Sequence, residues 1–280
     1  VLFLPVFCPT IGAHLNMKQV LISIYRLLVI FGIDPRKTIY SMRGLPHYFR
    51  NLQLLKKQKK SAAENFPFGS SYPCLGDRFS DSGSSKGHYF HQDLLVARRV
   101  HYNNPSTHVD VGSRIDGFVA HVASFRPIEV LDIRPLPNEI PNVKFTQADL
   151  MATIKNGLVE YCDSLSCLHA MEHFGLGRYG DPVSYDGYLL GLNNLYHILK
   201  KGGKLYFSVP IGPQRIEFDA HRVFSLSYLL ELFDGKYQID HFSFVDDQGD
   251  LHESVSMTEA DVKNSFSCTF GCGIFEMTKL

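Results

Sequence analysis

The chain has 280 residues, which is enough for one large α/β domain or for one domain with a helical extension. Hydrophobic residues make up 45% of it and charged residues 20%, as is ordinary for a soluble globular protein. The 28 basic residues balance the 28 acidic ones, which argues against nucleic acid as a main partner, because phosphate binding normally requires a basic excess. No run of 18 apolar residues occurs, so we expect no integral membrane span and a cytoplasmic protein.

Residues 1–60 are first apolar and then basic, and we expect them to form a helical extension. The extension ends in Lys56-Lys57-Gln58-Lys59-Lys60, where cations complement a helix dipole. A membrane surface or another anionic partner is the alternative for this basic run. The stretch from Met17 also has the charged start and apolar core of a signal peptide. No small-residue cleavage site follows it, so an amphipathic packing helix is the favoured interpretation.

Residues 61–87 are rich in Gly, Ser, Pro and Asp and predict a linker or mobile loop. From residue 88 to residue 280, strand-like and helix-like segments alternate, which predicts a parallel sheet with helices on both faces. The last two strands, joined without an obvious long helix, could pair antiparallel at the edge. The expected strands are 108–112, 128–133, 143–145, 163–168, 204–209, 236–246 and 272–278, and the expected helices include 118–125 and 185–199. The second helix is expected to end at Lys200-Lys201-Gly202-Gly203, a cationic last turn with a glycine cap.

The six cysteines stand at positions 8, 74, 162, 167, 268 and 272. No two-residue-spaced pair is matched by a second such pair or by histidines, so their spacing predicts no metal site. A chain of this size does not need disulfides for stability, and we expect reduced core thiols.

Acidic residues occur at the ends of the first three expected strands: Asp110 ends the first, Asp132 ends the second and Asp149 follows the third. In an open α/β sheet, ligands bind beyond the carboxyl ends of the strands. Asp132 lies 22 residues after Asp110 (132 − 110), close to the roughly 20 expected for an acid that binds ribose hydroxyls. Asp149 is suited to accept a hydrogen bond from an adenine amino group. For any one of these residues alone, a turn-forming or helix-capping role is the alternative. The occurrence of all three at successive strand ends favours a nucleoside site.

The turn after the first strand contains Gly112, Ser113 and Gly117. Glycines there let the backbone approach a ligand closely at the start of a helix. Arg114 and Asp116 stand where a second glycine is common, and Asp116 would repel a phosphate. A nicotinamide-dependent oxidoreductase is therefore a weak alternative, because the turn lacks Gly-x-Gly-x-x-Gly.

These motifs resemble the class I S-adenosylmethionine-dependent methyltransferases over roughly residues 86–280. The resemblance rests on Asp110-Val-Gly112, Val130-Leu-Asp132, Ala148-Asp149, the run from Asp163 to His173, and the run from Leu199 to Pro210. More closely, residues 89–93, 169–181 and 218–224 resemble an uncharacterised domain-of-unknown-function family of nematodes and bacteria. The resemblance implies a Rossmann-like seven-stranded sheet of order 3-2-1-4-5-7-6 with an antiparallel last strand. It also implies S-adenosyl-L-methionine as the cofactor.

Carried over by the resemblance, Asp110, Gly112, Ser113 and Gly117 would shape the methionine end of the cofactor pocket. Asp132 would hold the ribose, and Asp149 would meet the adenine edge. The segment containing Tyr89 and Gln92 resembles a helix that covers the cofactor, where an aromatic face stabilises the sulfonium. Core packing is the alternative for Tyr89.

Methyl transfer to a hydroxyl or amine of a small molecule or glycan is the function that these features predict. The loops after the fourth and fifth strands supply Glu172, His173 and His221, and we expect His173 or His221 to act as the base. A helix-capping role is the alternative for Glu172 and His173, and clustered His, Glu and Asp side chains could also hold a divalent cation. A non-catalytic binding or scaffold module with the same fold is the alternative function, supported by the missing glycines of the first turn.

Overall fold

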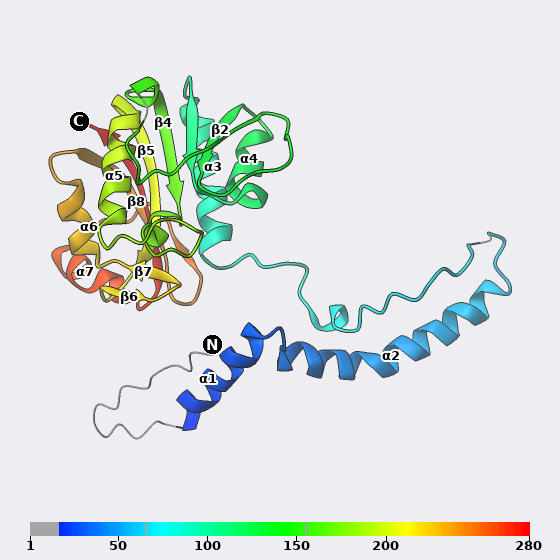
Figure 1. Cartoon of the computed structure of the whole chain (residues 1–280). Coiled ribbons are helices and arrows are strands. Elements are labelled where there is room, and N and C mark those ends of the chain that lie inside the picture. The colour runs from blue at the N-terminus through cyan, green and yellow to red at the C-terminus, as the bar shows by residue number, and fades with distance from the viewer. Residues whose placement is uncertain (1–16, 65, 155) are drawn as a thin grey trace, which may run out of the picture. The chain divides into compact units, whose positions relative to one another are not determined.

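The computed structural model describes residues 17–64, 66–154 and 156–280. The chain divides into two units, the first ending at Gly83 and the second running from Ser84 to Leu280. Figure 1 shows both, the first built on two helices and the second on a sheet covered by helices.

The first unit contains α1 (Met17–Ile30) and α2 (Pro35–Lys59). Asp34 begins α2 by accepting hydrogen bonds from the backbone N–H groups of Arg36 (2.9 Å) and Lys37 (3.3 Å), as an N-cap does. The segment after α2 has little regular structure apart from η1 (Asp77–Phe79), yet it packs on the helix, since the Phe79 ring stacks on Tyr40 at 5.9 Å. The segment predicted as a linker or mobile loop is therefore in contact with α2 over part of its length.

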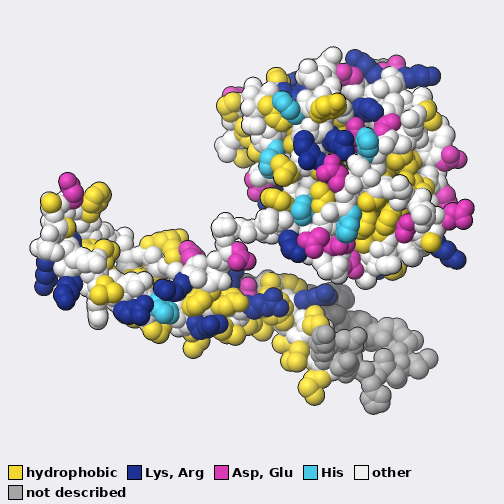
Figure 2. Space-filling model, turned by 180° about the vertical axis from the view of Figure 1, so that it is seen from behind, with side chains coloured by type: hydrophobic (Ala, Val, Ile, Leu, Met, Phe, Trp, Pro, Cys, Tyr) yellow, Lys and Arg dark blue, Asp and Glu magenta, His cyan; other side chains and the backbone are white. Residues whose placement is uncertain are grey.

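Both helices of the first unit expose apolar and basic side chains, which alternate along their surface (Figure 2). Residues 17–60 contain ten Lys and Arg residues and a single acidic residue, Asp34. Leu21, Ile30 and Met42 are each at least 60% exposed. Within the described ranges, no helix combines the length and the apolar character needed to cross a bilayer.

The second unit is organised around an eight-stranded sheet of order β3-β2-β1-β4-β5-β10-β8-β9. Strands β1 to β5 pair in parallel, and β10 pairs antiparallel with β5 and with β8. With β8 and β10 as the sixth and seventh strands of the predicted order, the expected 3-2-1-4-5-7-6 sheet is confirmed. The strands are β1 (His108–Val111), β2 (Ile128–Asp132), β3 (Val143–Gln147), β4 (Cys162–Leu168), β5 (Leu199–Ile211), β8 (Tyr237–Val245), β9 (Leu251–His252) and β10 (Gly271–Lys279). A separate two-stranded sheet pairs β6 (Arg215–Glu217) with β7 (His221–Val223).

Helices cover both faces of the sheet, and each face has its own apolar core. One face packs against α3 (His88–Asn103), η2 (Ile115–Val119) and α4 (Ala120–Ala123). The other packs against α5 (Gly187–Ile198) and α6 (Leu226–Phe233), with α7 (Glu259–Asn264) beside α6. Short turns η3 (Asn156–Leu158), η4 (Met171–His173) and η5 (Ser265–Ser267) complete the unit. This is the predicted Rossmann-like α/β fold.

Two predicted helices differ in the structure. The expected helix 118–125 is a π-helical turn, η2, followed by the single turn α4. The expected cationic last turn at residues 200–203 is wrong, because α5 ends at Ile198 and these residues belong to β5. Leu199 is fully buried and pairs with Cys162 of β4, so tertiary packing draws the segment into the sheet.

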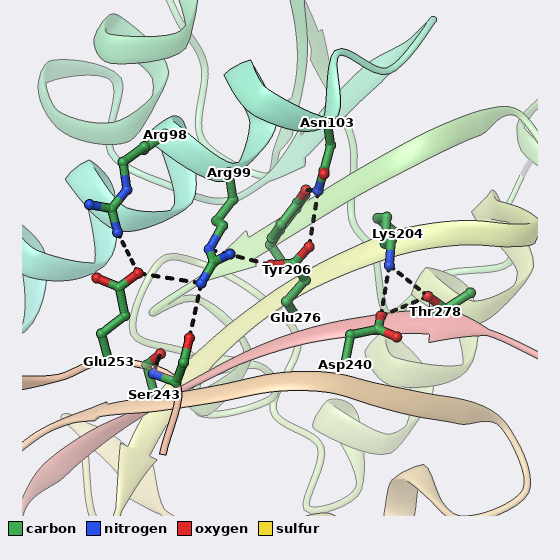
Figure 3. A network of polar contacts seen from close by, with 11 residues as sticks. Arg98, Arg99, Asn103, Lys204, Tyr206, Asp240, Ser243, Glu253, Glu276 and Thr278 are labelled. Atoms are coloured by element: carbon green, nitrogen blue, oxygen red, sulfur yellow. Dashed lines mark hydrogen bonds and ion pairs between the residues drawn. The ribbon is translucent and has the colours of Figure 1, made fainter. Parts of the chain in front are cut away.

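Polar contacts hold α3 against the sheet (Figure 3). The side-chain amide of Asn103 donates to the Tyr206 hydroxyl (2.6 Å) and to Glu276 Oε1 (3.0 Å), which lie on β5 and β10. Arg99 pairs with Glu253 at 3.3 Å. Because these contacts anchor the later turns of α3, they also fix the position of its first turn.

The described cysteines are free thiols. Cys162, Cys167, Cys268 and Cys272 are buried, as expected for core thiols, and Cys74 is exposed. Cys8 lies outside the described residues.

Candidate cofactor-binding and catalytic site

A cleft of about 320 Å³ lies at the carboxyl ends of β1, β2 and β4. Parallel strands end at the same edge of a sheet, so the loops that follow them meet there. The predicted site residues that line this cleft are Tyr89, Gly112, Asp132, Asp149 and His173. His169, Arg134 and Tyr179 line it as well.

Asp110 does not line the cleft but shapes the turn after β1. Its carboxylate is fully buried and accepts hydrogen bonds from the Ser113 hydroxyl (2.7 Å), the Ser113 backbone N–H (3.0 Å) and the Ser166 hydroxyl (2.5 Å). Burial raises the pKa of Asp110 to about 6, although these hydrogen bonds act in the opposite direction. Asp110 and Ser113 therefore act on the cleft through the backbone of the turn that they hold.

Gly112 is the point at which this turn reaches the cleft. Its φ of +72° lies in the left-handed region, and a Cβ atom there would stand 2.8 Å from the Cβ atom of Ala170. Gly117 sits elsewhere, against α3, where a Cβ atom would meet the Asp93 carboxylate at 2.4 Å. Only glycine fits either backbone without a shift of its neighbours.

Asp132 ends β2 with its side chain 11% exposed, and it is already paired. Arg134 approaches both of its carboxylate oxygens, through Nε at 3.0 Å and Nη2 at 2.6 Å, and the Arg134 backbone N–H donates at 2.8 Å. The Arg134 guanidinium also lies 4.6 Å from the centre of the Tyr179 ring. Arg134 was not singled out from the sequence, because an arginine two residues after an acid carries no distinctive pattern.

Asp149 follows β3 and lines the cleft. One of its oxygens, Oδ1, accepts a hydrogen bond from the Met151 backbone N–H at 2.8 Å. This turn orients the carboxylate, and no hydrogen bond to its other oxygen is found among the described residues. Asp149 can therefore accept a further hydrogen bond.

Tyr89, in the first turn of α3, is 43% exposed and lines the cleft. Its ring centre lies 5.1 Å from that of His169 and 5.6 Å from the Arg114 guanidinium, which also pairs with Asp116. Gln92, one turn later, is 1% exposed, and its Oε1 accepts a hydrogen bond from the Ser208 hydroxyl at 2.6 Å. Tyr89 is therefore available to a ligand, whereas Gln92 links α3 to the Ser208 side chain of β5 and does not line the cleft.

Glu172 lies in η4, and its side chain is 1% exposed. Its Oε1 accepts a hydrogen bond from His169 Nδ1 at 2.6 Å and lies 3.7 Å from His173 Nε2. Burial raises the pKa of Glu172, but the charges and hydrogen bond of the two histidines outweigh it and the net shift is downward. Glu172 is thus a buried carboxylate that orients histidines.

His173 and His221 are unequally placed. His173 Nδ1 lies 2.7 Å from the carbonyl oxygen of Ala220, so that nitrogen donates and Nε2 is left to accept a proton. Burial lowers the pKa of His173, despite the opposing charge of Glu172, and keeps its imidazole neutral. The His221 ring, on β7, lies 6.4 Å from that of His173 and does not line the cleft.

The strand order and the cleft at its carboxyl edge define the second unit as a class I methyltransferase-like α/β domain. Residues 140–270 match the model of a family described as "Caenorhabditis protein of unknown function, DUF268". This match confirms the resemblance to a domain-of-unknown-function family that the sequence motifs indicated. Among curated proteins, no sequence matches the chain.

Solved structures with a similar arrangement include two methyltransferases and a cyclase. The N-methyltransferase NodS from Bradyrhizobium japonicum WM9, in complex with S-adenosyl-L-homocysteine, is 10% identical, with 69% of this chain and 88% of that chain covered at a TM-score of 0.44. The 1,6-didemethyltoxoflavin-N1-methyltransferase from Burkholderia thailandensis is 15% identical, covering 67% and 78% at a TM-score of 0.43. The [4+2]-cyclase SpnF is 13% identical, covering 75% and 84% at a TM-score of 0.47. The fold assignment itself rests on the strand order.

Proposed function

We propose that the second unit binds S-adenosyl-L-methionine in this cleft and transfers its methyl group to a hydroxyl or amine of a small molecule or glycan. The observation that carries the proposal is the meeting of Gly112, Asp132 and Asp149 in one cleft. These residues follow three successive strands, and each has the chemistry that one part of the cofactor needs.

The residues present fit the cofactor in their donor set. The Asp132 carboxylate can accept two ribose hydroxyl hydrogens, and such charge-assisted bonds are the strong kind. Asp149 has an oxygen left for an adenine amino group. Tyr89 offers an aromatic face to the positive sulfonium, an attraction that grows where water is excluded.

The cofactor, when bound, supplies an electrophilic methyl group on a sulfonium. The protein's own residues must align the acceptor, exclude water and remove a proton where the acceptor is a hydroxyl. His173 is the residue that we assign as base, since it lines the cleft and its Nδ1–H is engaged by the Ala220 carbonyl. Glu172 lies beside it and favours the imidazolium that forms.

Calorimetry with S-adenosyl-L-homocysteine tests cofactor binding. We expect Asp132→Ala to weaken binding by at least about 100-fold, because it removes two hydrogen bonds to a charged group, which contribute about 1.5 to 3 kcal/mol each. Asp234→Ala, which changes an exposed carboxylate after α6, is the matched control and should bind like the unaltered protein. The proposal fails if the unaltered protein binds neither the cofactor nor its demethylated product.

Arg134 competes with the ribose for Asp132. We expect Arg134→Ala to tighten cofactor binding about three- to tenfold, because the guanidinium no longer has to be displaced while the backbone N–H of residue 134 still orients the carboxylate. The gain in affinity should be larger for S-adenosyl-L-methionine, whose sulfonium is cationic, than for S-adenosyl-L-homocysteine, whose sulfur is neutral. Weaker binding of both ligands would show instead that Arg134 contacts the cofactor.

Cofactor binding without methyl transfer to any component of a cell extract would favour the alternative, a non-catalytic binding or scaffold module. Binding and transfer are therefore measured separately, on the same preparation.

A further inference from the structure

Three side chains with metal-binding atoms lie together in the second unit, and one of them, His169, lines the cleft. His88 begins α3, His169 follows β4 and Cys272 is the second residue of β10. One ligand atom from each lies within 4.8 Å of the other two. His169 and Cys272 are buried, and His88 is half-buried.

We propose that His88, His169 and Cys272 bind a zinc ion. Two imidazole nitrogens and one thiolate are ligands that zinc prefers, whereas magnesium and calcium favour oxygen. Three protein ligands leave a fourth tetrahedral position open, as in catalytic zinc sites. His169 lines the cleft, so this open position is near it.

The surroundings of His169 supply an independent observation. Its Nδ1 is held by Glu172 Oε1 at 2.6 Å, and its buried Nε2 makes no hydrogen bond within the described part of the chain. A carboxylate that holds one nitrogen of a histidine while the other binds metal is the usual outer-shell arrangement of zinc sites. An unpartnered buried polar atom is otherwise costly, so a ligand for Nε2 gives this arrangement a physical reason.

The charges of the site also suit a divalent cation. Binding replaces the Cys272 thiol proton, which leaves to solvent, and the resulting thiolate offsets one positive charge. Glu172, a buried carboxylate with Oε2 unpartnered among the described residues, offsets the other. The ion would therefore sit in a neutral group of residues rather than as an uncompensated buried charge.

The geometry requires a small closure. With zinc–nitrogen distances of about 2.0 Å and zinc–sulfur distances of about 2.3 Å, tetrahedral ligand atoms lie about 3.3 to 3.6 Å apart. The His88 ring is stacked on His169, with centres 5.1 Å apart and planes 15° apart, so it must turn to point its nitrogen at a shared ion. His88 is only half-buried, but its ring centre also lies 5.2 Å from that of Phe270, so the turn requires a shift relative to this neighbour.

Cobalt substitution tests the site directly on the full chain. In a background lacking Cys8 and Cys74, we expect metal-free protein to bind one equivalent of Co²⁺ with tetrahedral visible bands and a near-ultraviolet thiolate-to-cobalt band, and one equivalent of Zn²⁺ to displace it. Cys272→Ser should abolish the thiolate band, and Cys268→Ser, which alters a buried thiol four residues earlier, should keep it. His88→Gln should weaken zinc binding by at least about tenfold, whereas His101→Gln, at the far end of α3, should not.

Glu172→Gln tests the outer shell. Zinc affinity should fall about 10- to 100-fold while the thiolate band remains, because the ligands themselves are unchanged.

The proposal is overturned if less than about a tenth of an equivalent of zinc survives desalting, if the cobalt spectrum is octahedral without a thiolate band, or if Cys272→Ser binds zinc like the parent. If Cys272→Ser does not fold, the spectrum of the parent and the His88→Gln titration decide. All measurements omit the methyl donor, so they are independent of the proposed transferase activity.

Discussion

His173→Asn is expected to lower the rate of methyl transfer about 10²- to 10⁴-fold, the range that a positioned general base contributes. The side chain lines the cleft, and its Nδ1–H is held by the Ala220 carbonyl, so Nε2 is the proton acceptor. Asparagine can still donate to that carbonyl but cannot take a proton at neutral pH. The measurement is the transfer of radiolabelled methyl groups to small molecules of an extract, with cofactor affinity determined in parallel.

Two controls separate chemistry from folding in this experiment. His197→Asn alters an exposed histidine of α5 and should leave the rate unchanged. His221→Asn should have a smaller effect than His173→Asn, because His221 does not line the cleft. A His173→Asn rate within about threefold of the unaltered protein contradicts the assignment of His173 as base, since a positioned base contributes far more. An equal loss in His221→Asn would mean that the pair acts together.

Gly112→Ala is expected to destabilise the second unit by about 2 to 4 kcal/mol and to abolish cofactor binding. A left-handed φ costs a non-glycine residue about 1 kcal/mol or more, and the new Cβ atom stands 2.8 Å from Ala170 Cβ. Relieving that overlap costs about 1 to 3 kcal/mol more. Denaturant unfolding and calorimetry with S-adenosyl-L-homocysteine measure the two effects.

Gly235 provides a matched control, because its φ is +65° and a Cβ atom there meets nothing within 4 Å. Gly235→Ala should therefore lose only the conformational part, about 1 kcal/mol. The double variant Gly112→Ala, Ala170→Gly removes the overlap and should recover part of the stability. If the single variants at 112 and 235 are equally destabilised, close approach to Ala170 is not what requires glycine at position 112.

Much of the candidate site could be predicted because it depends on local sequence around each strand. Asp132 and Asp149 were predicted from their places after the second and third strands, and both line the cleft. The sheet order followed from the family resemblance and matches the structure. A strand that ends in a polar residue places it at the carboxyl edge of a parallel sheet whatever the rest of the chain does.

Side-chain pairing decided other features. Asp110 and Gln92 were predicted to bind the cofactor, yet both are buried, do not line the cleft and hydrogen-bond other side chains of the protein. Arg134 covers Asp132, and Leu199 draws the segment after α5 into β5. Each outcome depends on which groups burial brings into contact, and hydrophobic periodicity or motif spacing does not record those contacts.

The sequence by itself determined the α/β class of the second unit and the acids at its strand ends, because these follow from apolar periodicity, turn residues and motif spacing. The order of the strands came from the resemblance to a known family. Only the tertiary structure brought His88, His169 and Cys272 together from three elements that span 184 positions (272 − 88). Their spacing in the sequence has no metal-binding pattern. The physical reason is that the sheet places strands distant in the chain side by side, with the antiparallel last strand beside β5. Packing, and not spacing in the sequence, therefore decides which side chains meet at one site.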